Sequence, residues 1–219
     1  MKRPPGVRAG ISRDDVLGAA LALLRSDGLS AVSMRRVAEA VGVAPNALYS
    51  HFPDKHALVD ALMDEVLGGV DEPTRGNWRS RIEAILSDTR RVLLAHPDLV
   101  PLFLARQTTG PNAMRLGEAM LAALDRGGIR GPRAVLALQS LLVHTIGASA
   151  FEIPRRDDPD PDGRRRRGEA ATRALPQREF PHTTALGEEI ARYPGDAVFR
   201  LGLESLLDGL QVRASAGEP

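Results

Sequence analysis

The stretch from Ser33 to Lys55, SMRRVAEAVGVAPNALYSHFPDK, restricts the fold of this chain more than any other segment. Its apolar residues recur at the three- and four-residue spacing of a helix on both sides of Gly42. Ser33 is a favourable N-cap, and Pro45 suits the first turn of a helix. Gly42 between them is expected to make the turn. The stretch therefore predicts two short helices, at about 33–41 and 45–51, joined by a tight turn.

The second predicted helix has few apolar anchors, Ala47 and Leu48, so most of its side chains are free for other contacts. The remaining side chains are polar or aromatic: Asn46, Tyr49, Ser50 and His51. In a helix-turn-helix, the second helix enters the DNA major groove, which is about 12 Å wide. A generic helical hairpin inside a bundle has the same periodicity. The spacing alone leaves both interpretations open.

The rest of the chain shows the same helical periodicity, and we predict an all-α protein. Apolar residues make up 43% of the 219 residues, which is enough for a packed core, and aromatic residues make up 4%. Runs of β-branched and aromatic residues are short, so strand signals are weak. Further helices are expected to end near Gly68 and His96, and to lie at about 112–126, 132–151, 184–192 and 196–213.

Composition and motifs argue against several functional classes. The chain has no cysteine, so it cannot form disulfides or thiolate metal sites. It has no Gly-rich phosphate loop, HExxH or GxSxG motif, and we expect no catalytic residue and no cofactor. MKRPPGVRAG lacks the apolar core of a signal peptide. The longest apolar run, 134–151, is interrupted by Gln139 and His144, so a buried helix fits it better than a membrane span.

Two segments stand apart from this periodicity. Residues 1–11 are rich in Pro, Gly and basic residues and are expected to form a flexible basic arm. Residues 154–181 contain several prolines and are expected to form a long, flexible polar loop. For the run Arg164–Arg167 within it, a disordered segment or a solvated helix is favoured over a nucleic-acid site. The last expected helix is apolar on more than one side, so a partner subunit is expected to cover it.

The segment around the predicted hairpin resembles the N-terminal domain of the tetracycline-repressor (TetR) family. The resemblance rests on the pattern "A…GV…LY.HF..K..L" over roughly residues 12–62, carried here by Ala38, Gly42, Val43, Leu48, Tyr49, His51, Phe52, Lys55 and Leu58. It implies that double-stranded operator DNA is the partner. By this resemblance, second-helix contacts fall on Ser33, Arg35 and Arg36. Recognition-helix contacts fall on Ala44, Pro45, Asn46 and Ser50, and backbone contacts on Tyr49, His51 and Lys55.

The second half resembles, more weakly, the ligand-binding and dimerisation domain of the tetracycline-repressor branch, through LLAHPDLVPLF, HTIGASAFE and FRLGLESLLDGL. The resemblance implies a homodimer through helices near 132–151 and 196–213. The drug-holding histidine of that branch is replaced around Gly68 and Gly69, and the magnesium-coordinating histidine by Phe103. The matching acidic residue, Glu152, is retained. We therefore expect no tetracycline–magnesium chelate and no metal site.

His144 and Glu152 share one face of the same predicted helix, eight residues apart. They are candidates for a metal pair, although a capping or interface role is favoured. An effector pocket is expected among the middle helices and would take a small, mostly hydrophobic molecule. Its candidate lining residues, for each of which plain core packing is an alternative, are Ile85, Thr89, Phe103, Arg106, Gln107, Met114 and Leu138.

Together these features predict a cytoplasmic, homodimeric repressor that binds a palindromic operator and is released by a small-molecule effector. The predicted division is an N-terminal three-helix helix-turn-helix DNA-binding domain at 12–58 and a helical ligand-binding and dimerisation domain at 59–219. Three alternatives remain open at this stage. The first is a regulator of the same fold that lacks small-molecule induction or that activates transcription. The second is an enzyme, and the third is a purely structural helical dimer.

Overall fold

The computed structural model describes residues 11–215, which are helical with no strand in that range. Contacts divide the chain into two compact units. The first contains residues up to Gly69 together with 105–115, and the second contains 70–104 and the residues from Leu116 onward. The all-α prediction is confirmed. The predicted basic arm lies outside the described residues, apart from Ile11.

The first unit is a compact bundle of short helices around α1. Its elements are α1 (Arg13–Asp27), η1 (Leu29–Ala31), α2 (Met34–Val41), η2 (Pro45–Ser50) and α3 (Lys55–Leu67). The α1 helix begins with a capping box, in which Ser12 and Asp15 each satisfy a backbone N–H of the other. It contacts both α2 and α3. The fully buried side chains of this core include Val16, Val37, Leu48, Phe52, Leu58 and Leu62.

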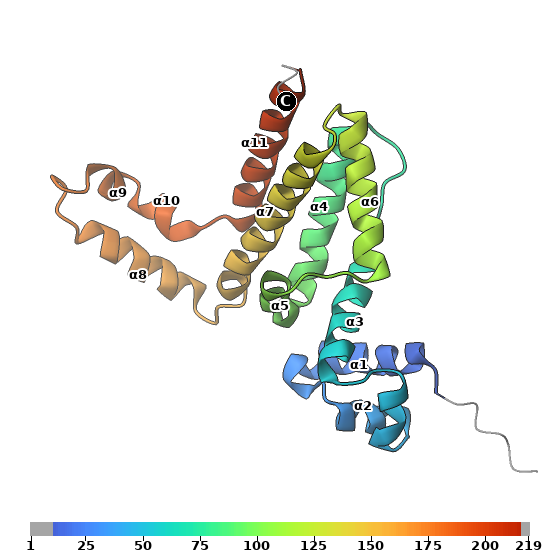
Figure 1. Ribbon diagram of the computed structural model, residues 1–219. Coiled ribbons are helices and arrows are strands. Elements are labelled where there is room, and N and C mark those ends of the chain that lie inside the picture. Colours follow the sequence, from blue (N-terminus) through green and yellow to red (C-terminus); the bar gives the residue numbers. More distant parts are fainter. Residues whose placement is uncertain (1–10, 216–219) are drawn as a thin grey trace, which may run out of the picture. The chain divides into compact units, whose positions relative to one another are not determined.

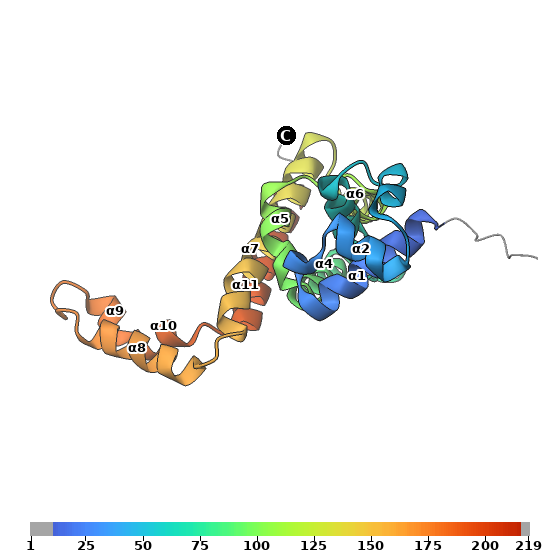
Figure 2. The same cartoon turned by 90° about the horizontal axis from the view of Figure 1, so that it is seen from below.

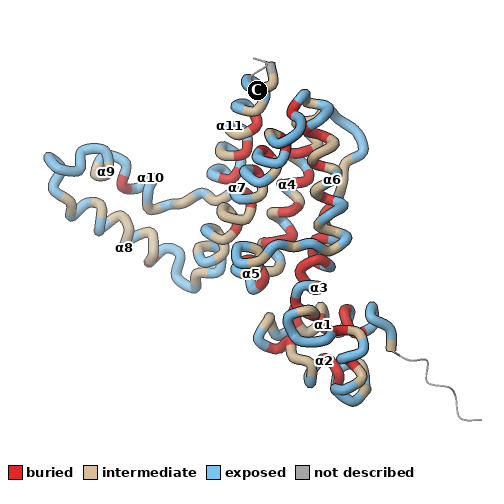
Figure 3. The backbone as a smooth tube through the Cα atoms, viewed as in Figure 1, coloured by how far each residue is buried: buried red, intermediate tan, exposed pale blue. Residues whose placement is uncertain are grey.

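The second unit is built around three long helices. It contains α4 (Trp78–Ala95), η3 (Pro97–Leu99), α5 (Val100–Ala105) up to Leu104, α6 (Pro111–Arg126) from Leu116 onward, α7 (Pro132–Arg156), α8 (Pro161–Arg173), α9 (Pro181–Ala185), α10 (Gly187–Arg192) and α11 (Gly195–Ser215). Helix α7 packs against α4 on one side and α11 on the other (Figure 1). Buried residues concentrate along the facing sides of these helices (Figure 3).

Helix α7 is 25 residues long and buries a stripe at helical spacing, formed by Ala134, Ala137, Leu141, Thr145 and Ser149. By length and composition alone it could cross a membrane, and 28% of its most apolar 18 residues are buried within the protein. The buried hydroxyls of Thr145 and Ser149 donate to the carbonyls of Leu141 and Thr145, at 2.9 and 2.8 Å. The buried stripe faces protein, as expected for a core helix of a bundle.

The polar connection expected at 154–181 is mostly helical, so the loop interpretation is wrong for residues 161–173. Helix α8 begins at Pro161 after an Asp160 side chain that accepts the N–H of Gly163 at 2.8 Å. Arg165 lies 3.5 Å from both Asp162 and Glu169, one turn away on either side. These local contacts support a largely solvated helix, the other form considered from the sequence. In both Figure 1 and Figure 2, α8, α9 and α10 form a hairpin that projects from the α7–α11 layer.

The predicted domain boundary at residue 58 falls inside α3, which continues without interruption to Leu67. The first unit accordingly keeps the whole of α3. A boundary near Gly69 divides the helices more naturally than one at 58, and the functional division of the chain remains a prediction.

Candidate nucleic-acid interface

The turn between α2 and η2 has the construction that the sequence predicts. The Ser33 hydroxyl caps α2 by accepting the backbone N–H of Arg36 at 3.2 Å. Gly42 ends the helix with φ +73°, in the left-handed region. The next N–H, of Val43, bonds back to the carbonyl of Ala38 at 3.0 Å. This 6→1 bond fixes the direction in which the chain leaves α2.

The candidate reading helix, η2, is a 3-10 helix over Pro45–Ser50, one residue shorter than predicted. Leu48 is fully buried and anchors it, and the Leu48 carbonyl accepts the N–H groups of His51 and Phe52 at 2.9 Å each. The guanidinium of Arg13 lies 4.7 Å from the ring centre of the buried Phe52, which links α1 to the end of η2. The buried side chains of Leu48 and Phe52 therefore anchor the candidate reading helix to the core of the first unit.

The side chains predicted to meet DNA lie mainly on the uncovered side of η2. Tyr49 is 51% exposed, and the other exposed residues of this group are Ala44, Pro45, Asn46 and Ser50. The Ser50 hydroxyl donates to the Ala47 carbonyl at 2.8 Å. His51 is half-buried at the end of the helix. The uncovered side thus combines short polar groups with one large phenol, which suits contact with base edges and phosphates.

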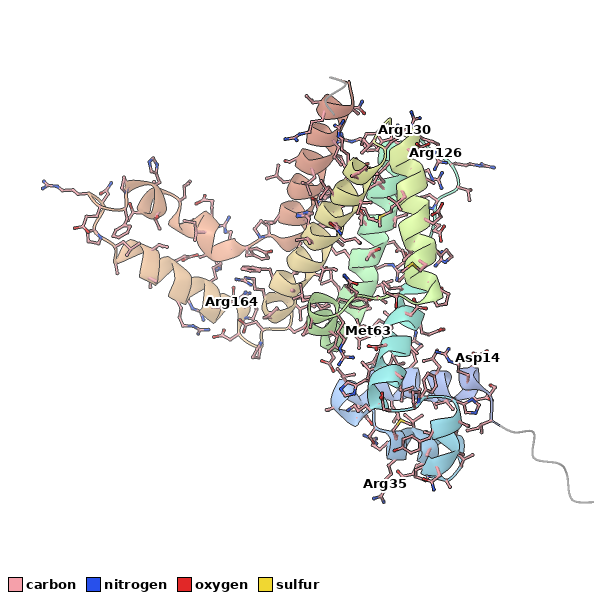
Figure 4. The ribbon with its side chains drawn as sticks, viewed as in Figure 1. Asp14, Arg35, Met63, Arg126, Arg130 and Arg164 are labelled. Carbon is pink, nitrogen blue, oxygen red and sulfur yellow. The ribbon has the colours of Figure 1, made fainter. Side chains whose placement is uncertain are left out.

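The basic candidates surround this helix, and two of them already have acidic partners. Arg35 bonds to Glu39 at 3.0 Å, with 83% of the arginine side chain exposed, and it points away from α2 (Figure 4). Arg36 bonds to Asp27 at 2.6 Å across to α1. Exposed ion pairs contribute little free energy, so phosphates can replace these carboxylates at low cost. Lys55 is the exposed first residue of α3, which Asp54 caps through the Ala57 N–H at 2.8 Å.

The candidate effector residues are spread over both units. In the second unit, Ile85 and Thr89 are buried in the core, and the Thr89 hydroxyl donates to the Ile85 carbonyl at 2.8 Å. Phe103 and Leu138 are half-buried there. In the first unit, Arg106 bonds to Asp60 at 2.8 Å, Gln107 lines a cavity, and Met114 is 55% exposed. The effector pocket remains a prediction.

The retained acidic residue Glu152 has a partner of its own. Its carboxylate bonds to Arg90 of α4, and Arg90 also lies 3.3 Å from Asp196 of α11. The Arg90 guanidinium is 5.0 Å from the centre of the Phe199 ring. His144 Nε2 lies 2.9 Å from the Phe199 carbonyl oxygen, and its ring stacks on Phe199 with centroids 5.5 Å apart. His144 and Glu152 thus join α7 to its neighbours.

Within residues 11–215, no group of three or more His, Asp or Glu side chains could hold a metal ion. The sequence interpretation missed Arg90 and Asp64, two charged residues with defined partners. Asp64 is only 7% exposed and accepts the N–H of Ala113 at 2.9 Å. The sequence held one signal for the role of Asp64. The helix that follows Gly110 has no capping side chain of its own, so a residue from elsewhere in the chain is needed to cap it.

Comparison with known proteins matches both parts of the chain. Residues 16–62 match the model "Bacterial regulatory proteins, tetR family", and residues 71–214 match "Tetracyclin repressor-like, C-terminal domain". The transcriptional repressor DrrR1 of Streptomyces coeruleorubidus is 28% identical, covering 96% of this chain and 82% of that protein. The class A tetracycline repressor of transposon 1721 from Escherichia coli is 30% identical, covering 90% and 89%.

Among solved structures, apo ActR from Streptomyces coelicolor superposes with a TM-score of 0.87 at 28% identity, covering 97% of this chain and all of that one. ActR has also been solved in complex with actinorhodin, with a TM-score of 0.85. The matched models cover both halves of the chain, and the N-terminal match includes the helices that carry the candidate DNA-contact residues. The chain therefore belongs to the TetR family of bacterial transcriptional regulators.

Proposed function

We propose that the chain is a cytoplasmic, homodimeric repressor that binds a palindromic operator through residues 33–55 and leaves it when a small, mostly hydrophobic effector binds. The observation that carries this proposal is the α2–η2 pair. It combines a left-handed Gly42 turn, a buried Leu48 anchor and an uncovered row of polar side chains. Regulation of transcription is its proposed role, without a catalytic activity.

In this proposal, the residues divide into base readers and phosphate contacts. Asn46 and Ser50 lie on the exposed side of η2, where their short polar groups suit base edges. Arg35, Tyr49 and Lys55 are exposed donors that suit phosphate oxygens. Ser33 contributes by capping α2, and Ala44, Pro45, Arg36 and His51 complete the expected contact set.

Dimer formation is proposed through α7 and α11, because each helix exposes large apolar side chains on a side that this subunit leaves uncovered. On α7, Leu136 is 63% and Val143 71% exposed, and on α11, Leu201 is 68% exposed. Exposed apolar surface of this kind marks an interaction site. A second copy would cover both helices and place two reading helices about 34–36 Å apart, or a multiple of it, as successive major grooves require.

The proposed effector is an apolar or aromatic small molecule that binds without magnesium. The tetracycline repressors and ActR, whose complex holds actinorhodin, are both similar to this chain. Phe103 stands where the magnesium-coordinating histidine is expected, and the carboxylate of Glu152 is bonded to Arg90. An effector can shift the protein from its DNA-binding state to its released state only by as much as it binds the released state more tightly. Thermal-shift titration with actinorhodin, and with tetracycline with and without magnesium, tests this part.

Operator selection from random duplex DNA tests the function. We expect enrichment of one palindrome whose half-sites are about one helical turn apart, or a multiple. Arg35→Ala should weaken binding to that palindrome, whereas Arg25→Ala, at an exposed arginine of α1 outside the contact set, should leave it unchanged. Absence of any enriched sequence, or equal effects of the two substitutions, would contradict the proposal.

A further inference from the structure

Residues 105–115 lie on one face of α3, although in the sequence they fall within the C-terminal domain of the family. The C-terminal family match spans 71–214 and includes this segment, whereas its contacts assign it to the first unit with α3. Arg106 bonds to Asp60 at 2.8 Å, and residues 112–113 bond to Asp64. Asp60 and Asp64 are four residues apart, so both point from the same side of the helix.

The contact at Asp64 is a helix cap supplied from a different helix. The carbonyl of Gly110 accepts the N–H of Met114 at 3.0 Å, which makes Gly110 the N-cap residue of α6. Glycine has no side chain with which to bond the next free N–H groups. Asp64 supplies it, accepting the backbone N–H groups of Asn112 at 3.2 Å and Ala113 at 2.9 Å. Its negative charge also favours the positive end of the helix dipole.

Burial and sterics make this contact specific. Asp64 is 7% exposed, and it also accepts the side-chain amide of Asn112 at 3.2 Å. A Cβ atom at position 110 would overlap the Asp64 carboxyl group, so the close approach requires glycine there. A cavity of about 550 Å³ is lined by α1, α3 and residues 107–112. With open space on that side, the position of the segment depends on a few polar contacts.

We propose that Asp64 is a positioning residue for DNA binding: by capping α6 from α3, it clamps residues 105–115 to the helix that begins at Lys55, directly after the reading helix. The proposal rests on the proposed function. Figure 4 labels Met63, the residue before Asp64 on α3. Loosening this clamp leaves α3 less firmly held and lowers the fraction of protein poised for the operator.

The test compares the wild type with Asp64→Ala, the double variant Asp64→Ala/Gly110→Ser, and Glu65→Ala as an exposed neighbour on α3. Each full-length protein is titrated with the selected operator at several salt concentrations and melted. An N-cap side chain contributes about 1 kcal/mol. We therefore expect Asp64→Ala to lower the melting temperature by about 2–4 °C and the operator affinity by about fivefold. The salt slope should not change, because no phosphate contact is lost.

The double variant separates capping from clamping. Serine at position 110 caps α6 from within its own helix, and the space left by Asp64 admits its side chain. The melting temperature should therefore return, while operator affinity stays about fivefold low because α6 is no longer held to α3. Glu65→Ala should resemble the wild type.

Recovery of operator affinity together with the melting temperature would reduce Asp64 to a structural cap and overturn the proposal. Wild-type affinity in Asp64→Ala, or an equal loss in Glu65→Ala, would also overturn it. In each of these cases the wild type still binds its operator, so the proposed function stands. A wild type that selects no operator would overturn the function and this inference together.

Discussion

Replacing Glu152 tests the buried ion pair that joins α4 to α7. The side chain of Arg90 is 11% exposed and that of Glu152 is 17% exposed, so the pair is largely removed from water. Glu152→Leu would leave a buried guanidinium with the Asp196 carboxylate at 3.3 Å and the Phe199 ring at 5.0 Å. Breaking a buried pair by removing one partner costs roughly 3–5 kcal/mol. Because Asp196 remains, we expect the lower value, about 3 kcal/mol.

This loss corresponds to a fall of about 6–12 °C in the melting temperature for a chain of this size. Circular dichroism melts measure it, at fixed protomer concentration because dimer formation adds to apparent stability. Asp196→Ala is the control: Asp196 is 59% exposed, so its loss should cost at most about 1 kcal/mol. The double variant Arg90→Met/Glu152→Leu should be more stable than Glu152→Leu, since it leaves no unpaired charge.

Equal losses in Glu152→Leu and Asp196→Ala would refute this reasoning, because burial would then not govern the cost. A double variant less stable than Glu152→Leu would refute it as well, because the unpaired guanidinium would then not be the source of the loss.

Four further predictions concern other parts of the chain. Lys55→Ala should weaken binding to all DNA sequences and lower the salt slope by about one, and unchanged affinity in a gel-shift titration would contradict this. Gly42→Ala should cost roughly 1–2 kcal/mol in urea unfolding, because φ is +73° there. Hydrogen bonds from Arg91 lower the pKa of Asp88, so the stability it contributes is present above about pH 4 and lost as pH falls further; Asp88→Asn should flatten that part of a pH-dependent melt. Val143→Lys should leave the subunit folded and yield monomers in sedimentation, since Val143 is 71% exposed on α7.

Local chemistry made the α2–η2 pair predictable from the sequence. Ser33 caps α2 and Gly42 makes the turn after it, as the sequence predicts, and the structure adds that Gly42 is left-handed. Leu48 is buried, as expected for an apolar anchor of a short helix, and the other expected anchor, Ala47, is half-buried. These features depend on residues within one or two turns of one another, so a linear pattern contains them.

The sequence left open whether the arginine run in α8 is disordered or helical, because amphipathic periodicity was the main criterion. Its sequence, PDGRRRRGEAATR, has almost no apolar residue, and only Gly163 is buried. The start signal was nevertheless present: Asp160 is a good N-cap and Pro161 a good first residue. Weighting caps above apolar content would have identified this helix.

The pairings of Asp64 with residues 112–113 and of Arg90 with Glu152 join residues 48 or more positions apart. Single-sequence patterns do not encode which of many charged residues meet across the fold. Capping requirements narrow the choice in one case, since the glycine before α6 leaves N–H groups that need an outside acceptor. The effector pocket has no such local requirement, which is why its residues were harder to specify.

The most direct test of the central claim, that η2 reads the operator, is to repeat the DNA selection with Asn46→Ala. Asn46 is exposed on η2 and contributes nothing to the buried core. The selected palindrome should keep its half-site spacing and lose base preference at one position in each half-site, at about 1–3 kcal/mol per position. An unchanged base preference at every position would contradict the assignment of η2 as the reading helix.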